Sequence, residues 1–303
     1  MNARVQGLDP AAQDLGRTGV LGHLGHRDPR RLQRRGRAAA RDQPVAGSQQ
    51  ALSQGNQSLL IGNAQEGRGS HGDNTCSTSQ PTQANRAMTM QDPAIGEALC
   101  HGPDQAPNRL VLLHGWGADA DDLLDLGELL VGPQVSIVAL RAPLPHPAGM
   151  GRQWYDLQQS GWPQLPPARV ALHARLQALA ETVPLQQTVL LGFSQGAAMA
   201  LDVASGGGAT GDPLPLAGVI ACSGYPHPDW QPGPLSLPVL LSHGHQDPVV
   251  PHGASVELQR LLQAAGASVE LLSFDGGHSI DPDLFAAMRL FLQRCWRAEQ
   301  ARE

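Results

Sequence analysis

Short runs of apolar residues recur along the chain from residue 108 onward, separated by polar or amphipathic stretches. The runs are nearly continuous rather than alternating, which is typical of strands covered on both faces, as in a parallel sheet. We expect strands at residues 110–113, 135–140, 189–191, 216–221, 239–241 and 269–274.

Several segments between these runs carry helical patterns. Apolar residues spaced three and four apart predict one helix that ends at Gly266, a second that starts at Pro166 and Pro167, and a last one that starts at Asp281 and Pro282. The apolar positions of these helices are Leu258, Leu261, Leu262 and Ala265; Leu172, Leu176 and Leu179; and Leu284, Met288, Phe291 and Cys295. The alternation of strand and helix predicts an open α/β sheet with helices on both faces.

Composition divides the chain into two parts. All eleven aromatic residues lie at or beyond Trp116, and a segment without aromatic side chains lacks the largest contributors to apolar burial. We therefore expect a disordered low-complexity tail at residues 1–90 and one folded domain at residues 91–303. The composition changes abruptly beside Met88 and Met90, so translation starting at one of them, without the tail, is a further hypothesis.

Charge is distributed unevenly between these parts. Residues 1–90 hold 11 Arg and 6 acidic residues, a net charge of +5, whereas residues 91–303 hold 10 Arg and 21 acidic residues, a net charge of −11. An acidic domain repels phosphate backbones and anionic lipids, so nucleic acid and membrane are poor partners for it. A transit peptide would contain fewer acidic residues than the tail does, and a nucleic-acid-binding arm would have interspersed aromatic residues, which the tail lacks.

Other sequence signals are few. The four cysteines are too sparse for a disulfide framework, and no apolar run approaches the ~20 residues of a membrane-spanning helix. The start of the chain has no apolar stretch like that of a secretory signal. We expect a cytoplasmic protein without stable membrane insertion, and the sequence leaves monomer and homodimer both open.

The segment Gly192–Phe193–Ser194–Gln195–Gly196 follows an expected strand and precedes a run of small residues. This G-x-S-x-G pattern is typical of a sharp strand-to-helix turn that exposes a nucleophilic serine, with the glycines avoiding collisions with neighbouring backbone. The alternative is an ordinary glycine-rich turn. The context of the motif favours Ser194 as a nucleophile.

A nucleophilic serine needs an imidazole as base and a carboxylate to orient that imidazole. Asp247 and His278 each follow an expected strand, in the order serine, acid, histidine that α/β-hydrolases use. Asp275 is the other candidate acid, although it lies only three residues from His278. We expect a Ser194–His278–Asp247 triad.

The same region allows a metal-dependent alternative. His243, His245 and Asp247 have the H-x-H-x-D spacing of dinuclear metal hydrolases. Pro248 stands where that motif usually adds a histidine, and a metal mechanism would leave Ser194 without a role. We therefore expect no metal and no organic cofactor.

Two more segments predict which residues line the expected substrate cleft. The His114–Gly115 dipeptide predicts a bend that turns the backbone N–H of Trp116 toward the nucleophile, so Trp116 and Gln195 are the expected oxyanion donors. The Pro/Gly-rich loop at residues 141–162 is either a cleft wall or a surface loop pinned by aromatics. Its expected substrate-binding residues, with Trp116, are Arg152, Trp154 and Tyr155. No stretch after the serine is long enough for a large cap domain, which predicts an open cleft.

Five motifs in order carry a family resemblance. They are His114–Gly115–Trp116–Gly117, residues 152–156 (RQWYD), residues 192–200 (GFSQGAAMA), residues 243–251 (HGHQDPVVP) and Gly277–His278. Over residues 108–292 the chain resembles the phospholipase/carboxylesterase group of α/β-hydrolases, which includes the acyl-protein thioesterases. The resemblance implies the α/β-hydrolase fold, the triad above, and hydrolysis of carboxylic ester or thioester bonds in a small molecule or an acylated protein.

Two positions depart from the acyl-protein thioesterase pattern. Trp116 stands where those enzymes have an aliphatic residue, which would narrow an acyl pocket, and Ala197 stands in place of a glycine. We therefore expect short-chain esters to be favoured over long-chain acylated proteins. The competing hypotheses are a dienelactone-hydrolase-like enzyme, which would usually have Cys at position 194, and a non-catalytic ligand-binding protein with this fold.

Overall fold

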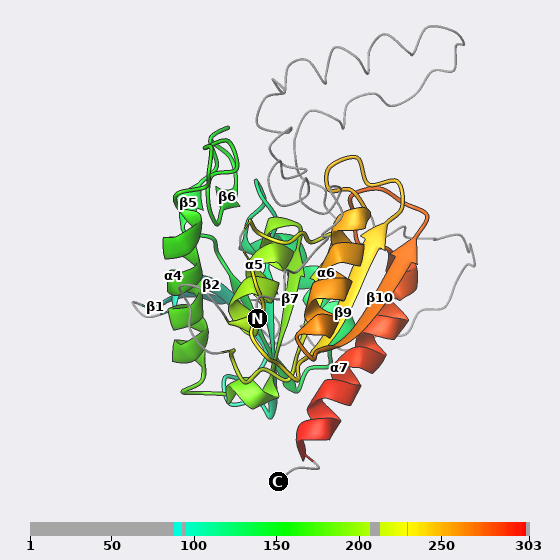
Figure 1. The fold of residues 1–303 in the computed structure, drawn as a ribbon. Coiled ribbons are helices and arrows are strands. Elements are labelled where there is room, and N and C mark those ends of the chain that lie inside the picture. Colours follow the sequence, from blue (N-terminus) through cyan, green and yellow to red (C-terminus); the bar gives the residue numbers. More distant parts are fainter. Residues whose placement is uncertain (1–87, 93–94, 207–212, 229, 301–303) are drawn as a thin grey trace, which may run out of the picture.

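An eight-stranded sheet runs through the part of the chain that the structure, a computed structural model, describes: residues 88–92, 95–206, 213–228 and 230–300 (Figure 1). The strand order is β1-β2-β4-β3-β7-β8-β9-β10. The strands are β1 (Met88–Asp92), β2 (Gly96–His101), β3 (Asn108–Leu113), β4 (Val135–Leu140), β7 (Thr188–Phe193), β8 (Gly218–Cys222), β9 (Pro238–Gly244) and β10 (Ser268–Phe274).

The six strands expected from the apolar runs all form, and each pairs in parallel with its neighbours among them. Only β4 has the expected bounds; the other five strands differ at one or both ends by one to three residues, and β8 starts at Gly218 and not at residue 216. A Cβ at Gly218 would lie 2.7 Å from the Cys295 sulfur and 3.2 Å from the Phe291 ring. Gly218 thus lets the last helix pack directly against the first residue of this strand.

The strands β1 and β2 were not predicted. They pair antiparallel with each other, and β2 pairs antiparallel with β4, which extends the sheet at one edge. Because β1 begins at Met88, regular structure starts before the expected boundary at residue 91. The remainder of the expected tail lies outside the described residues.

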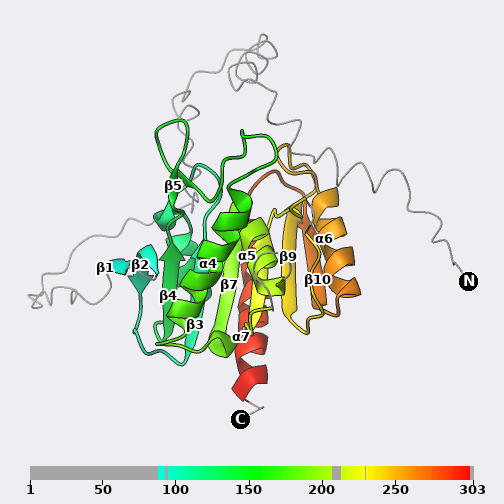
Figure 2. The ribbon, with the colours of Figure 1, turned by 60° about the vertical axis from the view of Figure 1, so that its left-hand side comes forward.

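Helices cover both faces of the sheet, as expected for the α/β-hydrolase fold (Figures 1 and 2). One face packs on α4 (Leu165–Leu179), α5 (Gln195–Ser205) and α6 (Gly253–Ala264). The other packs on α3 (Leu124–Leu130) and α7 (Phe285–Gln300). Alternate residues of one strand serve the two cores: in β3, Val111 and Leu113 face the first, whereas Leu110 and Leu112 face the second.

The predicted helix signals are confirmed with small adjustments. Gly266 ends α6 with a φ of +103°, and Asp281 caps the start of the last helical segment by accepting from the N–H of Asp283. The first turn of that segment is a 3-10 turn, η4 (Pro282–Leu284), and α7 proper begins at Phe285. Two further 3-10 turns, η2 (Ala120–Leu123) and η3 (Leu185–Gln187), precede α3 and β7.

The loop expected at residues 141–162 contains a small antiparallel hairpin that was not predicted. Its strands are β5 (Leu144–Pro145) and β6 (Arg152–Gln153). Figure 1 shows this hairpin at the same end of the molecule as the arrowheads of β9 and β10. No helix within the described ranges has the length and apolar character needed to span a bilayer.

Candidate active site

Ser194 lies between β7 and α5, at a strained turn. Its backbone has φ 53° and ψ −115°, a combination that residues with a Cβ rarely adopt. A Cβ at Gly196 would lie 2.0 Å from the carbonyl oxygen of Leu113, and one at Gly192 would lie 2.5 Å from that of Gly196. Both glycines of the motif are therefore required by close backbone contacts, as the sequence predicted.

The side chains of Ser194, His278 and Asp247 form a continuous hydrogen-bonded row. Nε2 of His278 lies 3.0 Å from Oγ of Ser194, and Nδ1 of His278 lies 2.7 Å from Oδ2 of Asp247. A neutral His278 with its proton on Nδ1 donates to Asp247 and accepts from the Ser194 hydroxyl. Ser194 is largely buried and keeps 9% of its surface exposed.

Asp247 is held in its ionised form. Burial alone would raise the pKa of this carboxyl, but hydrogen bonds from His243 and His278 outweigh burial and lower the pKa below its ordinary value. Its other oxygen, Oδ1, accepts from the N–H groups of Val249 and Val250 at 2.8 and 2.9 Å. The alternative acid, Asp275, is exposed, whereas Asp247 is the carboxylate in contact with the imidazole.

The loops that carry Asp247 and His278 touch each other along their backbones. The N–H of Gln246 donates to the carbonyl of Gly276 at 2.9 Å. A Cβ at Gly244 would lie 2.3 Å from that same carbonyl oxygen and 2.4 Å from that of Gly277. The close approach at Gly244 therefore sets the separation between acid and base.

Two backbone N–H groups lie beside the serine without an acceptor. Gly115 packs against the nucleophile, since a Cβ there would lie 3.5 Å from that of Ser194. Within the described residues, no backbone carbonyl accepts from the N–H of Trp116 or of Gln195, whereas the N–H of Gly117 donates to Arg152 at 2.9 Å. Within the described residues, no backbone carbonyl therefore occupies the N–H groups of the two residues that the sequence proposes as oxyanion donors.

The other expected substrate-binding residues lie deeper than the sequence suggested. Trp154 and Tyr155 are 1% and 0% exposed. The indole Nε1–H of Trp154 donates to the carbonyl of His114 at 2.9 Å, and the guanidinium of Arg152 donates to the carbonyls of Ala142 and Pro143. These contacts favour a supporting role for all three residues over direct contact with substrate. Trp116 is half-buried, and its ring lies edge-on to that of His146, with the two ring centroids 4.2 Å apart.

A buried polar network behind the site was not predicted. Nδ1 of His227 lies 2.6 Å from Asp202, Nε2 of His227 lies 2.9 Å from the hydroxyl of Tyr155, and that hydroxyl lies 2.7 Å from the hydroxyl of Tyr225. Asp202 also pairs with Arg169 at 2.7 Å. Burial lowers the pKa of His227 although Asp202 acts in the opposite direction. A neutral His227 donates to Asp202 and accepts from Tyr155, and Tyr155 in turn accepts from Tyr225.

The residues of the H-x-H-x-D spacing do not converge on one point. His243 is fully buried, with Nδ1 2.6 Å from the Ser255 hydroxyl and Nε2 2.8 Å from the carbonyl of Val250. Nε2 is also 3.2 Å from Asp247, so its N–H is shared between the two oxygens. With both ring nitrogens engaged, His243 does not fit a metal ligand. No group of three or more His, Cys, Asp or Glu in the described part of the chain is arranged to hold a metal.

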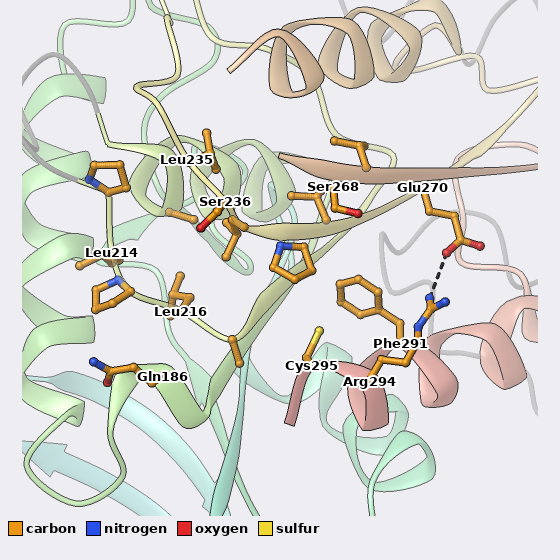
Figure 3. A pocket seen from close by; sticks show the side chains of 18 of the residues that line it. Gln186, Leu214, Leu216, Leu235, Ser236, Ser268, Glu270, Phe291, Arg294 and Cys295 are labelled. Atoms are coloured by element: carbon orange, nitrogen blue, oxygen red, sulfur yellow. Dashed lines mark hydrogen bonds and ion pairs between the residues drawn. The ribbon is translucent and has the colours of Figure 1, made fainter. Parts of the chain in front are cut away.

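A cavity away from Ser194 lies at the opposite end of the sheet, and Figure 3 shows the side chains that line it. It has a volume of about 610 Å³ and lies at the amino ends of β8, β9 and β10. An ion pair between Arg294 and Glu270, 3.0 Å apart, crosses its rim. Burial raises the pKa of Cys295 in its wall to about 12, so this thiol is not a nucleophile. The cavity therefore lacks the chemistry that the Ser194 site has.

The sequence profile of the phospholipase/carboxylesterase family matches residues 96–296, a span that includes the elbow and both loops of the triad. The chain belongs to the phospholipase/carboxylesterase family. This confirms the resemblance seen in the five motifs and identifies the protein as a hydrolase with the α/β-hydrolase fold.

Relatives of this phospholipase/carboxylesterase member include esterase YpfH of Escherichia coli (strain K12), which is 29% identical over 196 residues, covering 60% of the present chain and 81% of YpfH. The putative hydrolase MhqD of Bacillus subtilis (strain 168) is 28% identical over 184 residues, covering 57% and 86% of the two chains. Acyl-protein thioesterase 1 of Eremothecium gossypii is 31% identical over 132 residues, covering 41% and 54%.

Solved structures agree with the fold. Esterase PE8 superimposes with a TM-score of 0.53 at 30% identity, covering 65% of this chain and 97% of PE8. The Bacillus cereus carboxylesterase superimposes with a TM-score of 0.59 at 23% identity, covering 67% and 96%. The matches cover almost the whole of those proteins and about two thirds of this phospholipase/carboxylesterase member.

Proposed function

We propose that this protein is a serine hydrolase that cleaves carboxylic ester or thioester bonds through an acyl-enzyme intermediate. The observation that carries the proposal is the hydrogen-bonded row Ser194–His278–Asp247 at the carboxyl ends of β7, β9 and β10. An imidazole within hydrogen-bonding distance of a serine at a strained strand-to-helix turn is the arrangement that activates a hydroxyl for attack.

In the proposed cycle, Ser194 attacks the acyl carbonyl carbon while Nε2 of His278 takes the hydroxyl proton. Asp247 stabilises the imidazolium that results. The backbone N–H groups of Trp116 and Gln195 donate to the oxyanion, and the loss of one such donor typically costs ~3 kcal/mol of barrier. His278 then protonates the leaving alcohol or thiol. In the second half of the cycle, water attacks the acyl carbon while His278 takes a proton from it, and His278 returns that proton to Oγ of Ser194 as the acid is released. The cycle uses neither a metal nor an organic cofactor.

We further propose that short acyl groups are favoured. Trp116 is adjacent to Gly115, which packs on the nucleophile. The Trp116 indole is held in place by a 2.8 Å hydrogen bond to Gln153 and by the ring of His146. A large ring fixed at two points limits the length of chain beside the reacting carbon. An ester of a small molecule is therefore favoured over a long-chain acylated protein, which the thioesterase relatives suggest as the other substrate class.

A fluorophosphonate probe and an ester panel test these proposals. Labelling of the wild type, lost in Ser194→Ala, is the expected result for the nucleophile; a wild type that is not labelled contradicts the proposal and favours a ligand-binding protein. p-Nitrophenyl esters of increasing chain length, assayed beside an acyl thioester, test the acyl preference. A kcat/KM that rises with chain length up to palmitate contradicts the proposed preference.

A further inference from the structure

The two proposed oxyanion donors come from different segments, and a third segment connects them. Trp116 follows β3, and Gln195 begins α5 after β7. The strands pair only as far as Leu113 and Gly192, so both donors lie beyond the last paired residues. We infer that residues 152–155 form a brace that fixes the separation and direction of these two N–H groups, with the side chain of Gln195 as its principal positioning residue. This inference rests on the function proposed above.

The first half of the brace holds the Trp116 segment. The N–H of Gly117 donates to the carbonyl of Arg152 at 2.9 Å, and the N–H of Arg152 donates to the carbonyl of Ala118 at 2.7 Å. The Trp116 indole donates to Oε1 of Gln153 at 2.8 Å. Two of these hydrogen bonds fix the backbone that follows Trp116, and the third fixes the Trp116 side chain.

The second half holds the nucleophile elbow. Oε1 of Gln195 accepts from the N–H of Trp154 at 3.0 Å, and Nε2 of Gln195 donates to the carbonyl of Tyr155 at 2.8 Å. These two bonds are satisfied by only one orientation of the amide. Gln195 is fully buried, so neither bond competes with solvent. The residue that supplies one oxyanion donor from its backbone is thereby fixed by its side chain to the brace.

The brace itself is anchored on its far side. The indole of Trp154 donates to the carbonyl of His114, and the hydroxyl of Tyr155 is held by Tyr225 and His227. The guanidinium of Arg152 donates to two carbonyls after β4. These anchors account for the burial of Trp154 and Tyr155.

The expected effect is on the transition state. Donors aimed in advance at the developing oxyanion lower the barrier without reorganisation, and their misplacement by about 1 Å can cost about 100-fold in rate. Binding of the neutral ester in the ground state depends much less on that alignment. Loosening the brace should therefore reduce kcat while leaving KM nearly unchanged.

Gln195→Met tests the inference, because methionine has a similar length but forms neither hydrogen bond, and the backbone N–H is retained. Ser205→Ala is the matched control: Ser205 is a buried residue at the other end of α5, and its hydroxyl bonds the carbonyl of Leu201 and the indole of Trp230. The measurements are kcat, KM, melting temperature and the affinity of a trifluoromethyl ketone, whose adduct with the serine carries an oxyanion.

For Gln195→Met we expect kcat to fall by about 10- to 100-fold and trifluoromethyl ketone affinity to fall in proportion. KM should stay within about threefold, since ground-state binding is retained. For Ser205→Ala we expect a lower melting temperature and an unchanged kcat. A folded Gln195→Met enzyme with wild-type kcat overturns the inference, as does a fall in kcat without loss of inhibitor affinity.

Gln153→Met provides an independent test on the Trp116 side, and it decides the matter if Gln195→Met does not fold. A lowered kcat with unchanged KM supports the brace, whereas wild-type kinetics overturn it. Failure of the proposed function is distinguishable: a wild type with no esterase activity and no Ser194-dependent labelling contradicts the hydrolase, whereas an active wild type with an equally active Gln195→Met contradicts the brace alone.

Discussion

Ser194 has an unfavourable backbone conformation as well as the hydroxyl that we propose as the nucleophile, and substitution can separate the two effects. Glycine adopts φ 53° and ψ −115° more readily than alanine does, because it has no Cβ. We expect Ser194→Ala and Ser194→Gly to lose at least about 10⁴-fold in kcat. Ser194→Gly should be the more stable of the two by about 1 kcal/mol. Urea unfolding of both variants measures the difference, and equal stabilities would contradict strain at the elbow.

His114 gives the protein a pH-dependent component of stability. Burial lowers the pKa of its imidazole to about 4, below the ordinary value near 6.5. The neutral ring bonds the carbonyl of Gly115 and accepts from the N–H of Ala142. Since the unfolded chain takes up a proton first, this contribution is complete above about pH 6.5 and is lost as the pH falls toward 4.

Unfolding free energies of the wild type and His114→Asn, measured from pH 7.5 to 4, test this expectation. The wild type should lose more stability than the variant over that range, by up to about 3 kcal/mol. His173→Gln on α4 is the control: burial lowers the pKa of this half-buried histidine as well, but less far, so it should change the pH profile less. Parallel wild-type and His114→Asn profiles would disprove the expectation.

The residues of the hydrogen-bonded row could be predicted from their local sequence context. Ser194, Asp247 and His278 each follow an apolar run, and the expected edge of a parallel sheet brings such positions together. The supporting roles of Trp154 and Tyr155 could not be predicted from their local sequence. Their partners, His114 and Gln195, lie 40 residues away in either direction, and aromatic residues in a Pro/Gly-rich loop are compatible both with a cleft wall and with a surface loop pinned by aromatics.

At the level of elements, Gly244 controls how the loops after β9 and β10 meet. An alanine there would place its Cβ 2.3 Å from the carbonyl oxygen of Gly276, so the two loops must separate. We expect Gly244→Ala to lower kcat by at least about 10-fold, because Asp247 and His278 move apart. The free energy of unfolding should fall by about 1–3 kcal/mol. Esterase kinetics and urea unfolding provide the measurements.

Gly253→Ala is the matched control for this substitution. Gly253 is the first residue of α6, and no atom lies within 4 Å of the position its Cβ would take. An alanine there should leave activity unchanged and stability equal or slightly higher. Equal behaviour of the two alanine variants would show that the loop contact at Gly244 is unimportant.

The elements that the sequence predicted are those with a strong apolar signal. Five of the six predicted strands, β3, β4, β7, β8 and β9, are almost entirely buried, which leaves nearly uninterrupted apolar runs, and the edge strand β10 still carries enough apolar residues to be recognised. The antiparallel strands β1 and β2 lie at the sheet edge and are mostly half-buried or exposed, so their sequences carry no such run. The two-residue strands β5 and β6 are shorter than any periodicity can reveal.

At the scale of the whole molecule, the first strand in the described part of the chain starts at Met88, where β1 pairs with β2. A protein that starts at Met88 should keep the melting temperature and kcat/KM of the full chain. A protein that starts at residue 96 lacks β1, which leaves the edge of β2 unpaired, and should melt several degrees lower at a cost of about 1 kcal/mol.

Thermal unfolding and ester kinetics of the three proteins test this expectation. A loss of activity in the protein that starts at Met88 would assign a role to the preceding residues. N-terminal mass spectrometry of protein from its native source tests the separate hypothesis of translation from Met88 or Met90, which a peptide from residues 1–80 would contradict.

The base and the tip of the β5–β6 hairpin differ in their surroundings. Its base, at Arg152 and Gln153, is tied to the backbone around Trp116, whereas its tip, residues 147–150, is exposed at the end of the molecule that carries the triad (Figure 1). Because the tip is exposed and the base is tied down, insertions at residues 147–150 should leave the backbone around Trp116 in place.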